Sequence, residues 1–308
     1  MSAGSATLLG LDFSCAPTRR KPLTLAQGVR VGPAVKLLSL EAFATLDEWT
    51  ARLTPAGMAA AGWHHGFVMG CDFPFGLPRP FVQALAAQGP GDAFVALRDA
   101  DAPTAECDRL VASLHAHCGD RAGFQRLIDG WGVTWDTERP SGGKLLHRLT
   151  DRAVPGLSST SPLQTRYVPV GKMYFEGMKR LVDANVSLPG LRTGRPDAVA
   201  LEAYPGLLAG EILGRRSYKS DSDATPERLI ARMDLIDALE QGRTRLGLRL
   251  KLSPAQRDHL AADPKGDRLD AVLCLLQAAW AQAQTDAGAP PWGQALAVDP
   301  VEGWILTA

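Results

Sequence analysis

The chain has 308 residues, of which 45% are hydrophobic and 21% charged, with 33 basic and 33 acidic side chains. This balance is typical of a folded globular protein and excludes intrinsic disorder as the dominant state. The lack of net charge excludes a protein that coats nucleic acid with a generally basic surface. A local basic patch is still compatible with it. The length suits either one large α/β domain or two small ones, and no internal repeat or low-complexity linker divides the sequence. We therefore expect a single elaborated domain spanning residues 1–308.

The apolar segments are too short for a signal peptide or a membrane span. The segment Met1–Ser14 lacks a basic start, and the apolar run Ala271–Ala281 is short and interrupted by Gln277. The five cysteines form an odd set without a Cys-x-x-Cys pair, which argues against a disulfide scaffold. We therefore expect a cytoplasmic protein without a membrane partner.

Short apolar runs bounded by turn residues predict five strands. They lie at Ala6–Phe13, Pro22–Val29, Ala34–Leu40, Gly66–Asp72 and Ala198–Tyr204. The first three are joined by short turn-rich links, which predicts an antiparallel meander. A short terminal strand is also expected at Gly303–Leu306.

Helical patterns separate and follow these strands. Thr45 is expected to cap the first helix, with Glu48 as its capping-box partner. Further helices are predicted at Phe81–Ala87, Ala105–His117, Ala122–Ile128, Gly171–Val182, from Leu207, Pro226–Glu240 and Lys265–Ala283. The segment Gly132–Pro169 is expected to be mostly loop, which predicts a largely helical and irregular insertion over about residues 100–190, between strands four and five.

Three antiparallel strands, followed by two strands that are reached through helices, form the element order of the ribonuclease-H-like fold. The predicted fold is therefore an α/β fold of this kind, with a mixed five-stranded sheet flanked by helices. Because a fold alone does not determine a function, the positions of the acidic residues carry the functional prediction.

Acidic residues lie at the ends of three predicted strands. Asp12 ends the first, Asp72 the fourth, and Glu202 lies near the end of the fifth. Ligands gather beyond the carboxyl ends of parallel strands, so these acids are expected to share one crevice. Each of them alone is also explained by turn chemistry, since Asp before Ser or Pro is common in turns.

The predicted late helix adds two more acids near its start. Asp267 and Asp270 are three residues apart and share a face beside the apolar stripe of that helix. Asp267 is also explained as a helix cap or by the helix dipole. Asp270 lies one turn further in, next to apolar neighbours, and this explanation fits it less well.

Acids that converge on one cleft cannot all stay ionised without a counter-charge. Divalent cations with oxygen ligands supply it, and two such ions can activate a water and stabilise the leaving oxygen of a phosphodiester. We expect Mg²⁺ or Mn²⁺, as a pair of ions, held by Asp12, Asp72, Glu202, Asp267 and Asp270. Asp12, on the central first strand, is the best candidate to bridge both ions.

Several motifs resemble a family of predicted nucleases with a ribonuclease-H-like fold, catalogued as domain of unknown function family 429. They follow the family order over nearly the whole chain: Gly10–Pro17, Gly70–Pro78, Pro169–Gly177, Glu202–Pro205, Asp267–Ala271 and Glu302–Ile305. The resemblance implies a nuclease that uses the acids named above, an activity that is itself a prediction for the family. The chain departs from the family pattern at Gly266, where the family has a histidine.

Basic residues near these motifs are candidates for contacts with phosphate. Lys172, in the motif Pro169–Gly177, could neutralise a transferring phosphate, or could be a helix-start lysine whose stem lies along apolar surface. Two clusters could bind a nucleic-acid backbone or simply be solvated: Arg19, Arg20 and Lys21, and Arg215, Arg216, Tyr218 and Lys219.

Three functions remain open at this point. The first is a metal-dependent nuclease that hydrolyses the phosphodiester bonds of DNA or RNA, with Asp12, Asp72, Glu202, Asp270 and Lys172 as catalytic residues. The second is an ATP-binding phosphotransferase related to actin-like ATPases and sugar kinases, in which the turns after Asp12 and Asp72 hold a nucleotide. Those turns carry phenylalanine and proline rather than the glycines that let a backbone approach phosphate, which favours the nuclease. The third is a non-catalytic binding protein.

Overall fold

The computed structural model describes residues 6–135, 138–139, 145–154, 159–294 and 297–307. Its internal contacts group the chain into two compact units. The first comprises Met1–Asp72, Asp197–Gln294 and Thr307, and the second comprises Phe73–Pro196, Ala295–Leu306 and Ala308. The expected single domain with an insertion over about residues 100–190 stays a prediction.

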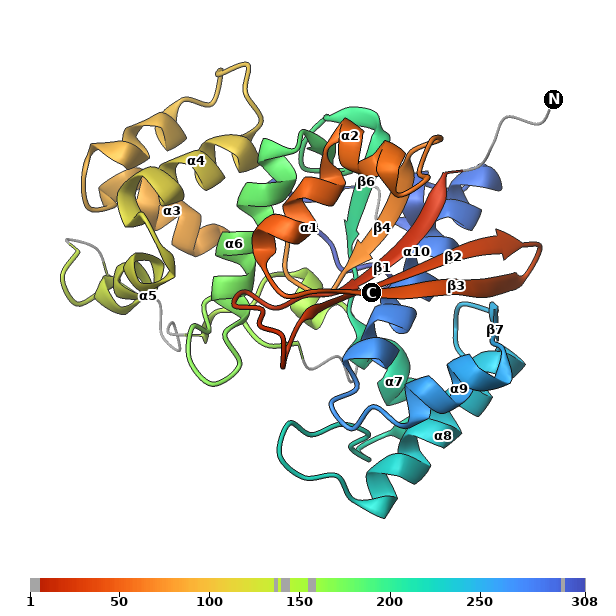
Figure 1. Cartoon of the computed structure of the whole chain (residues 1–308). Coiled ribbons are helices and arrows are strands. Elements are labelled where there is room, and N and C mark those ends of the chain that lie inside the picture. Colours follow the sequence, from red (N-terminus) through yellow and green to blue (C-terminus); the bar gives the residue numbers. More distant parts are fainter. Residues whose placement is uncertain (1–5, 136–137, 140–144, 155–158, 295–296, 308) are drawn as a thin grey trace. The chain divides into compact units, whose positions relative to one another are not determined.

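A seven-stranded mixed sheet, in the order β5-β6-β4-β1-β2-β3-β7, organises the fold (Figure 1). Its strands are β1 (Thr7–Asp12), β2 (Leu23–Val31), β3 (Ala34–Phe43), β4 (Phe67–Cys71), β5 (Val186–Ser187), β6 (Arg195–Glu202) and β7 (Arg249–Lys251). β2 runs antiparallel to both β1 and β3, which confirms the predicted meander. The pairs β1–β4, β4–β6 and β3–β7 are parallel. The predicted α/β class with a mixed sheet flanked by helices is therefore confirmed.

The sheet differs from the five-stranded prediction at its margins. β5 and β7 are additional strands of two and three residues, too short to show an alternating pattern in the sequence. The predicted terminal strand Gly303–Leu306 is wrong, because only Ile305 forms a bridge there. The backbone turns on both sides of it, with positive φ angles of 71° at Gly303 and 67° at Thr307.

The helix α10 (Asp267–Asp286) packs against β1, β2 and β4. Two glycines allow its backbone to touch the strands. A Cβ atom at Gly10 would lie 2.1 Å from the carbonyl oxygen of Ala271, and one at Gly70 would lie 2.4 Å from that of Cys274. This close approach fixes the first turns of α10 over the ends of β1 and β4.

The opposite face of the sheet is covered by α1 (Leu46–Leu53) and α2 (Pro55–Ala60) (Figure 1). The predicted capping box is confirmed: the Thr45 hydroxyl accepts from the Glu48 N–H at 3.1 Å, and the Glu48 carboxylate accepts from the Thr45 N–H at 3.1 Å. Trp49 on α1 is fully buried and meets Phe13 edge to face, with ring centroids 5.4 Å apart. This contact anchors the helical layer to the chain just after β1.

The remaining helices belong to one or the other unit. In the first unit they are α7 (Pro205–Leu213), α8 (Pro226–Gln241), α9 (Pro254–Ala261) and η4 (Pro291–Gly293). In the second unit they are α3 (Arg79–Gln88), η1 (Asp92–Arg98), α4 (Glu106–Cys118), α5 (Arg121–Gly130), η3 (Thr150–Arg152) and α6 (Val170–Asp183). All the predicted helices are present, whereas α2, α9, η1, η3 and η4 were not predicted.

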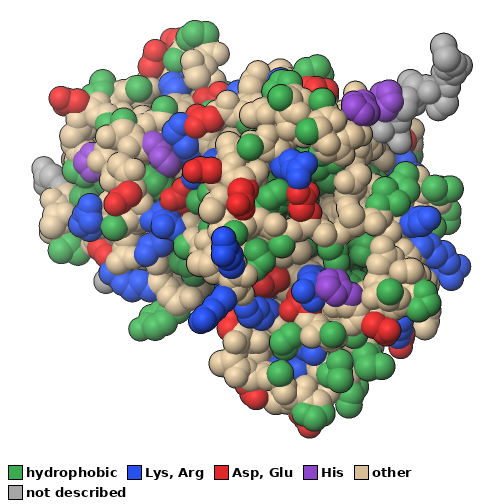
Figure 2. All heavy atoms as spheres, viewed as in Figure 1, with side chains coloured by type: hydrophobic (Ala, Val, Ile, Leu, Met, Phe, Trp, Pro, Cys, Tyr) green, Lys and Arg blue, Asp and Glu red, His purple; other side chains and the backbone are tan. Residues whose placement is uncertain are grey.

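Acidic and basic side chains are interspersed on the face shown in Figure 2, as expected for a chain with equal numbers of both. Among the helices that the structure describes, none combines the length and the apolar character needed to cross a membrane.

Candidate metal centre

Two aspartates lie side by side where β1 and β4 end. Leu11 on β1 pairs with Cys71 on β4, and the Asp72 N–H donates to the Leu11 carbonyl at 2.9 Å. Asp12 and Asp72 both directly follow this pair. Because side chains alternate between the faces of a strand, both aspartates share the face of Gly10 and Gly70, the one that α10 covers.

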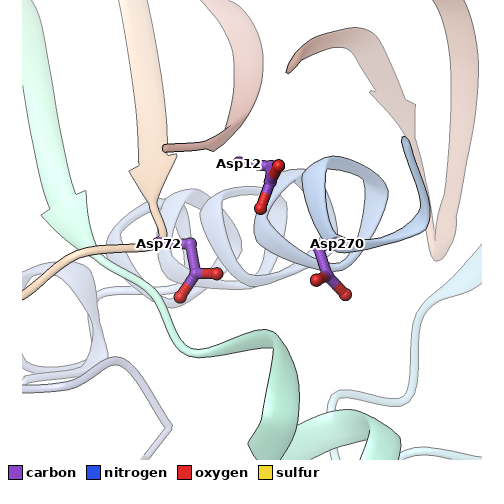
Figure 3. Close-up of side chains that lie close together, drawn as sticks. All are labelled: Asp12, Asp72 and Asp270. Carbon is purple, nitrogen blue, oxygen red and sulfur yellow. The ribbon is translucent and has the colours of Figure 1, made fainter. Parts of the chain in front are cut away.

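The first turn of α10 brings a third carboxylate to the same point. Asp270 lies one residue before Ala271, whose carbonyl touches Gly10. Carboxylate oxygens of Asp12, Asp72 and Asp270 all lie within 4.8 Å of one another, and Figure 3 shows the three side chains converging from β1, the end of β4 and α10. Asp270 is only 1% exposed, whereas Asp12 and Asp72 are half-buried. We call these three residues the carboxylate cluster.

Glu202 lies near this cluster without belonging to the group of three. It pairs with Cys71 on β4, so it shares the side of the sheet on which Cys71 lies, and Ala203 follows at the position beside Asp72. Glu202 is 4% exposed, and its charge still contributes to the raised pKa of Asp72. Its predicted role as a metal ligand stays a prediction.

Asp267 and Lys172 occupy two different kinds of position. The interpretation of Asp267 as the helix cap is wrong: Gly266 is the N-cap, in a left-handed conformation with φ 77°, and Asp267 is the first helical residue. Asp267 lies one turn before Asp270, and its charge is one cause of the raised pKa of Asp12. Lys172 lies half-buried in the first turn of α6, in the second unit, and its predicted contact with phosphate stays a prediction.

Two residues between α7 and α8 complete the surroundings of Asp270. The Tyr218 hydroxyl donates to one carboxylate oxygen of Asp270, and the Lys219 ammonium forms an ion pair with the other. Buried Arg232 on α8 fixes this segment by donating to the Tyr218 carbonyl at 2.8 Å and to the Ala261 carbonyl at 2.8 Å. The sequence flagged Tyr218 and Lys219 only as candidate phosphate contacts. No local pattern in the sequence links these two residues to α10, where Asp270 lies 51 residues after Lys219.

Burial and mutual repulsion make the carboxylate cluster costly to ionise. Burial, followed by the charges of Asp270 and Asp72, raises the pKa of Asp12 well above its ordinary value. Burial, followed by the charge of Asp270, raises the pKa of Asp72 to about 7. Burial by itself lowers the pKa of the Lys219 ammonium. The charge of the adjacent Asp270 outweighs this effect and raises that pKa. Among the described residues, Lys219 is the cation that forms an ion pair with the cluster.

The chemistry of the cluster fits a hard divalent cation. All three groups offer carboxylate oxygens, the ligands that Mg²⁺ and Mn²⁺ prefer. A bound cation would also offset the repulsion that raises the pKa values of Asp12 and Asp72. The ion pair with Lys219 engages only Asp270, so a bound cation would be needed to draw Asp12 and Asp72 together in their ionised form.

The raised pKa of Asp72 predicts how stability depends on pH without metal. Native Asp72 keeps its proton up to a pH of about 7, whereas an unfolded Asp loses it at about pH 4. The native state therefore binds more protons between these values, and its free energy of unfolding should fall as the pH rises through this window. Asp72→Asn should lose less stability over the same range. Urea unfolding in EDTA, with exposed Asp101→Asn as control, measures this, and parallel curves for wild type and Asp72→Asn would contradict it.

No family model, curated protein or solved structure matches this chain. The resemblance to the predicted-nuclease family therefore stays a prediction, and the geometry of the carboxylate cluster carries the functional argument.

Proposed function

We propose that this chain is a metal-dependent nuclease that hydrolyses phosphodiester bonds of nucleic acid. The observation that carries the proposal is the convergence of Asp12, Asp72 and Asp270 within 4.8 Å, from two adjacent parallel strands and the helix that covers them. Carboxylates on such rigid elements hold cations in a defined position, which phosphoryl transfer requires.

We further propose a ribonuclease-H-like fold for this protein. Five of its strands follow the order β3-β2-β1-β4-β6. The central strand β1 runs antiparallel to β2 on one side and parallel to β4 on the other. This order supports the element order inferred from the sequence. The carboxylate cluster then lies at the carboxyl ends of β1 and β4, where ligands of parallel strands gather.

The residues of the chain have distinct parts in the proposed reaction. Asp12 would hold a pair of Mg²⁺ or Mn²⁺ ions together with Asp72 and Asp270, with Asp267 as an outer carboxylate. Glu202, on the side of Cys71, would act on this site through its charge. Bound there, the two ions would supply an activated water for in-line attack and stabilise the departing oxygen.

Tyr218 and Lys219 are positioning residues in this proposal. Together they engage both carboxylate oxygens of Asp270, which restricts rotation of that side chain. The side chain of Lys219 is 46% exposed, so its ammonium can also face an incoming phosphate.

Substrate tests separate a nuclease from an ATP-dependent enzyme. Wild type should cleave or nick at least one single-stranded, duplex or hybrid substrate with Mn²⁺ and without ATP, measured on denaturing gels. EDTA should abolish the cleavage. Cleavage should depend on the carboxylate cluster, so Asp12→Asn prepared in parallel controls for a contaminating nuclease.

The actin-like alternative makes the opposite prediction. Tight ATP binding or ATP turnover, together with no cleavage over the whole substrate panel, would contradict the nuclease proposal and favour a phosphotransferase.

A further inference from the structure

A cavity of about 410 Å³ lies beside the first turn of α10 in the first unit. Three parts of the chain form its walls. They are the turn that follows β1, the paired ends of β2 and β3 at Thr24 and Ala42, and the connection between α9 and α10. Of the residues that line it, Asp267 is the one with a part in the proposed metal chemistry.

The walls of the cavity are rich in basic side chains, namely Arg19, Arg20, His259, Lys265 and Arg268. Three acids also line it, but two of them already have partners. Glu41 forms an ion pair with Arg52, and buried Asp263 accepts backbone N–H bonds from Lys265 at 3.2 Å and Arg268 at 3.0 Å. Four arginine and lysine side chains thus line the cavity beside three carboxylates, one of which is already paired with Arg52, so the cavity has an excess of positive charge although the chain as a whole is neutral.

Arg19 and Arg20 are the most available of these cations. Both are exposed, and within the described part of the chain neither guanidinium has an ion-pair or hydrogen-bond partner. Their backbone is nevertheless fixed. Thr18 and Lys21 form a bridge across the turn, and the Lys265 ammonium donates to the Arg20 carbonyl. An anchored turn with two free guanidinium groups is suited to binding phosphate, because the planar fork of arginine matches phosphate oxygens.

The cavity and the carboxylate cluster both lie at the start of α10. Asp267 lines the cavity and precedes Asp270 by three residues of α10, a rise of about 4.5 Å. A nucleic acid strand with one phosphate at the cluster would therefore have a further part of its backbone near the cavity.

We propose that this cavity binds the sugar–phosphate backbone of a nucleic acid strand next to the bond that is cut, with Arg19 and Arg20 as the main phosphate contacts. The inference rests on the proposed nuclease function and names the part of the substrate that this surface holds. Contacts of this kind fix the position of a strand without reading its sequence, so binding should be independent of base sequence.

Binding measurements with an arginine pair test the proposal. Fluorescence anisotropy of a labelled single-stranded oligonucleotide is recorded in CaCl₂ at several salt concentrations, with gels to verify that the strand stays intact. Arg19→Ala/Arg20→Ala should weaken binding roughly tenfold at low salt and reduce the slope of log K against log salt by about 0.7 for each lost phosphate contact. Arg243→Ala/Lys251→Ala, which removes two exposed basic side chains elsewhere in the same unit, should bind like wild type. Unchanged circular dichroism and melting temperature confirm that both variants are folded.

The outcomes separate the cavity from the metal chemistry. Wild-type affinity and salt slope in Arg19→Ala/Arg20→Ala, or equal weakening in both double variants, would overturn the cavity proposal. Binding of inorganic phosphate without any binding of oligonucleotide would also overturn it, because the site would then take only small anions. Strand binding that needs Arg19 and Arg20, in a protein that cleaves no substrate with Mn²⁺, would support the cavity proposal and overturn the proposed nuclease function.

Discussion

Asp270→Asn is expected to lower Mn²⁺-dependent cleavage about a hundredfold or more. Asp270 is almost fully buried, and its oxygens lie within 4.8 Å of those of Asp12 and Asp72. Replacing its charge with an amide removes an electrostatic contact to the cations that are proposed to stabilise the transition state. The expected loss of about 3 kcal/mol corresponds to that decrease in rate. Single-turnover cleavage at saturating Mn²⁺ measures it.

Stability in EDTA shows whether such a loss is specific. Asparagine has nearly the shape of aspartate and can still accept the hydroxyl of Tyr218, but it loses the ion pair with Lys219. That pair joins a half-exposed lysine to a buried carboxylate, so its loss lowers the free energy of unfolding. Relief of the repulsion with Asp12 and Asp72 opposes this loss, so the free energy of unfolding should change little.

A matched variant lies at the other end of the same helix. Asp286→Asn removes an exposed carboxylate that pairs with Arg30, and it should cleave like wild type. Full activity in Asp270→Asn would show that α10 does not complete the site, and the assignment of the carboxylate cluster would then be wrong.

The sequence predicts the strands of the site well, because buried parallel strands have a clear local signature. The apolar runs that end at Asp12 and Asp72 correspond to β1 and β4, and the amphipathic stripe around Leu269 corresponds to α10. Two glycines in the motifs, Gly10 and Gly70, allow these elements to touch. The sequence gives the glycines, but not the contacts they make with α10.

The face of the sheet on which Glu202 lies could not be predicted from the sequence. The strand β6 was predicted nearly at its observed position, and its acid lies at the expected end. The register with β4 decides which face that acid occupies, and a shift of one residue exchanges the two faces. Pairing with Cys71 places Glu202 on the side of Cys71 rather than that of Asp72. Register depends on tertiary packing and cannot be read from the strand alone.

Two of the helices that were not predicted had readable start signals. Thr54 caps α2 by accepting from the Gly57 N–H at 3.1 Å, and Ser253 caps α9 by accepting from the Gln256 N–H at 3.2 Å. Both caps are followed directly by proline, the favoured first residue of a helix. The pairing of Lys219 with Asp270 has no such signal, because it joins distant segments of the chain.

Asp12→Asn should abolish most of the stabilisation that divalent cations give to the protein. A ligand that binds only the native state raises the free energy of unfolding by about 2.7 kcal/mol at a hundred times its dissociation constant. Millimolar Mg²⁺ or Mn²⁺ should therefore raise the melting temperature of wild type by several degrees, and EDTA should reverse the shift. In Asp12→Asn the shift should largely disappear, because Asp12 is the member of the cluster on the central strand β1 and faces both other carboxylates.

Asp12→Asn should itself be at least as stable as wild type in EDTA, which separates metal binding from damage to the fold. Burial and the charges of Asp270 and Asp72 raise the pKa of Asp12, so ionising this group costs free energy in the native state at neutral pH. An amide at this position does not ionise and removes that cost. Sodium chloride at matched ionic strength controls for general screening, which should affect both proteins equally. Equal shifts with Mn²⁺ in wild type and Asp12→Asn would mean that the cation binds elsewhere, and the carboxylate cluster would no longer support metal-dependent chemistry.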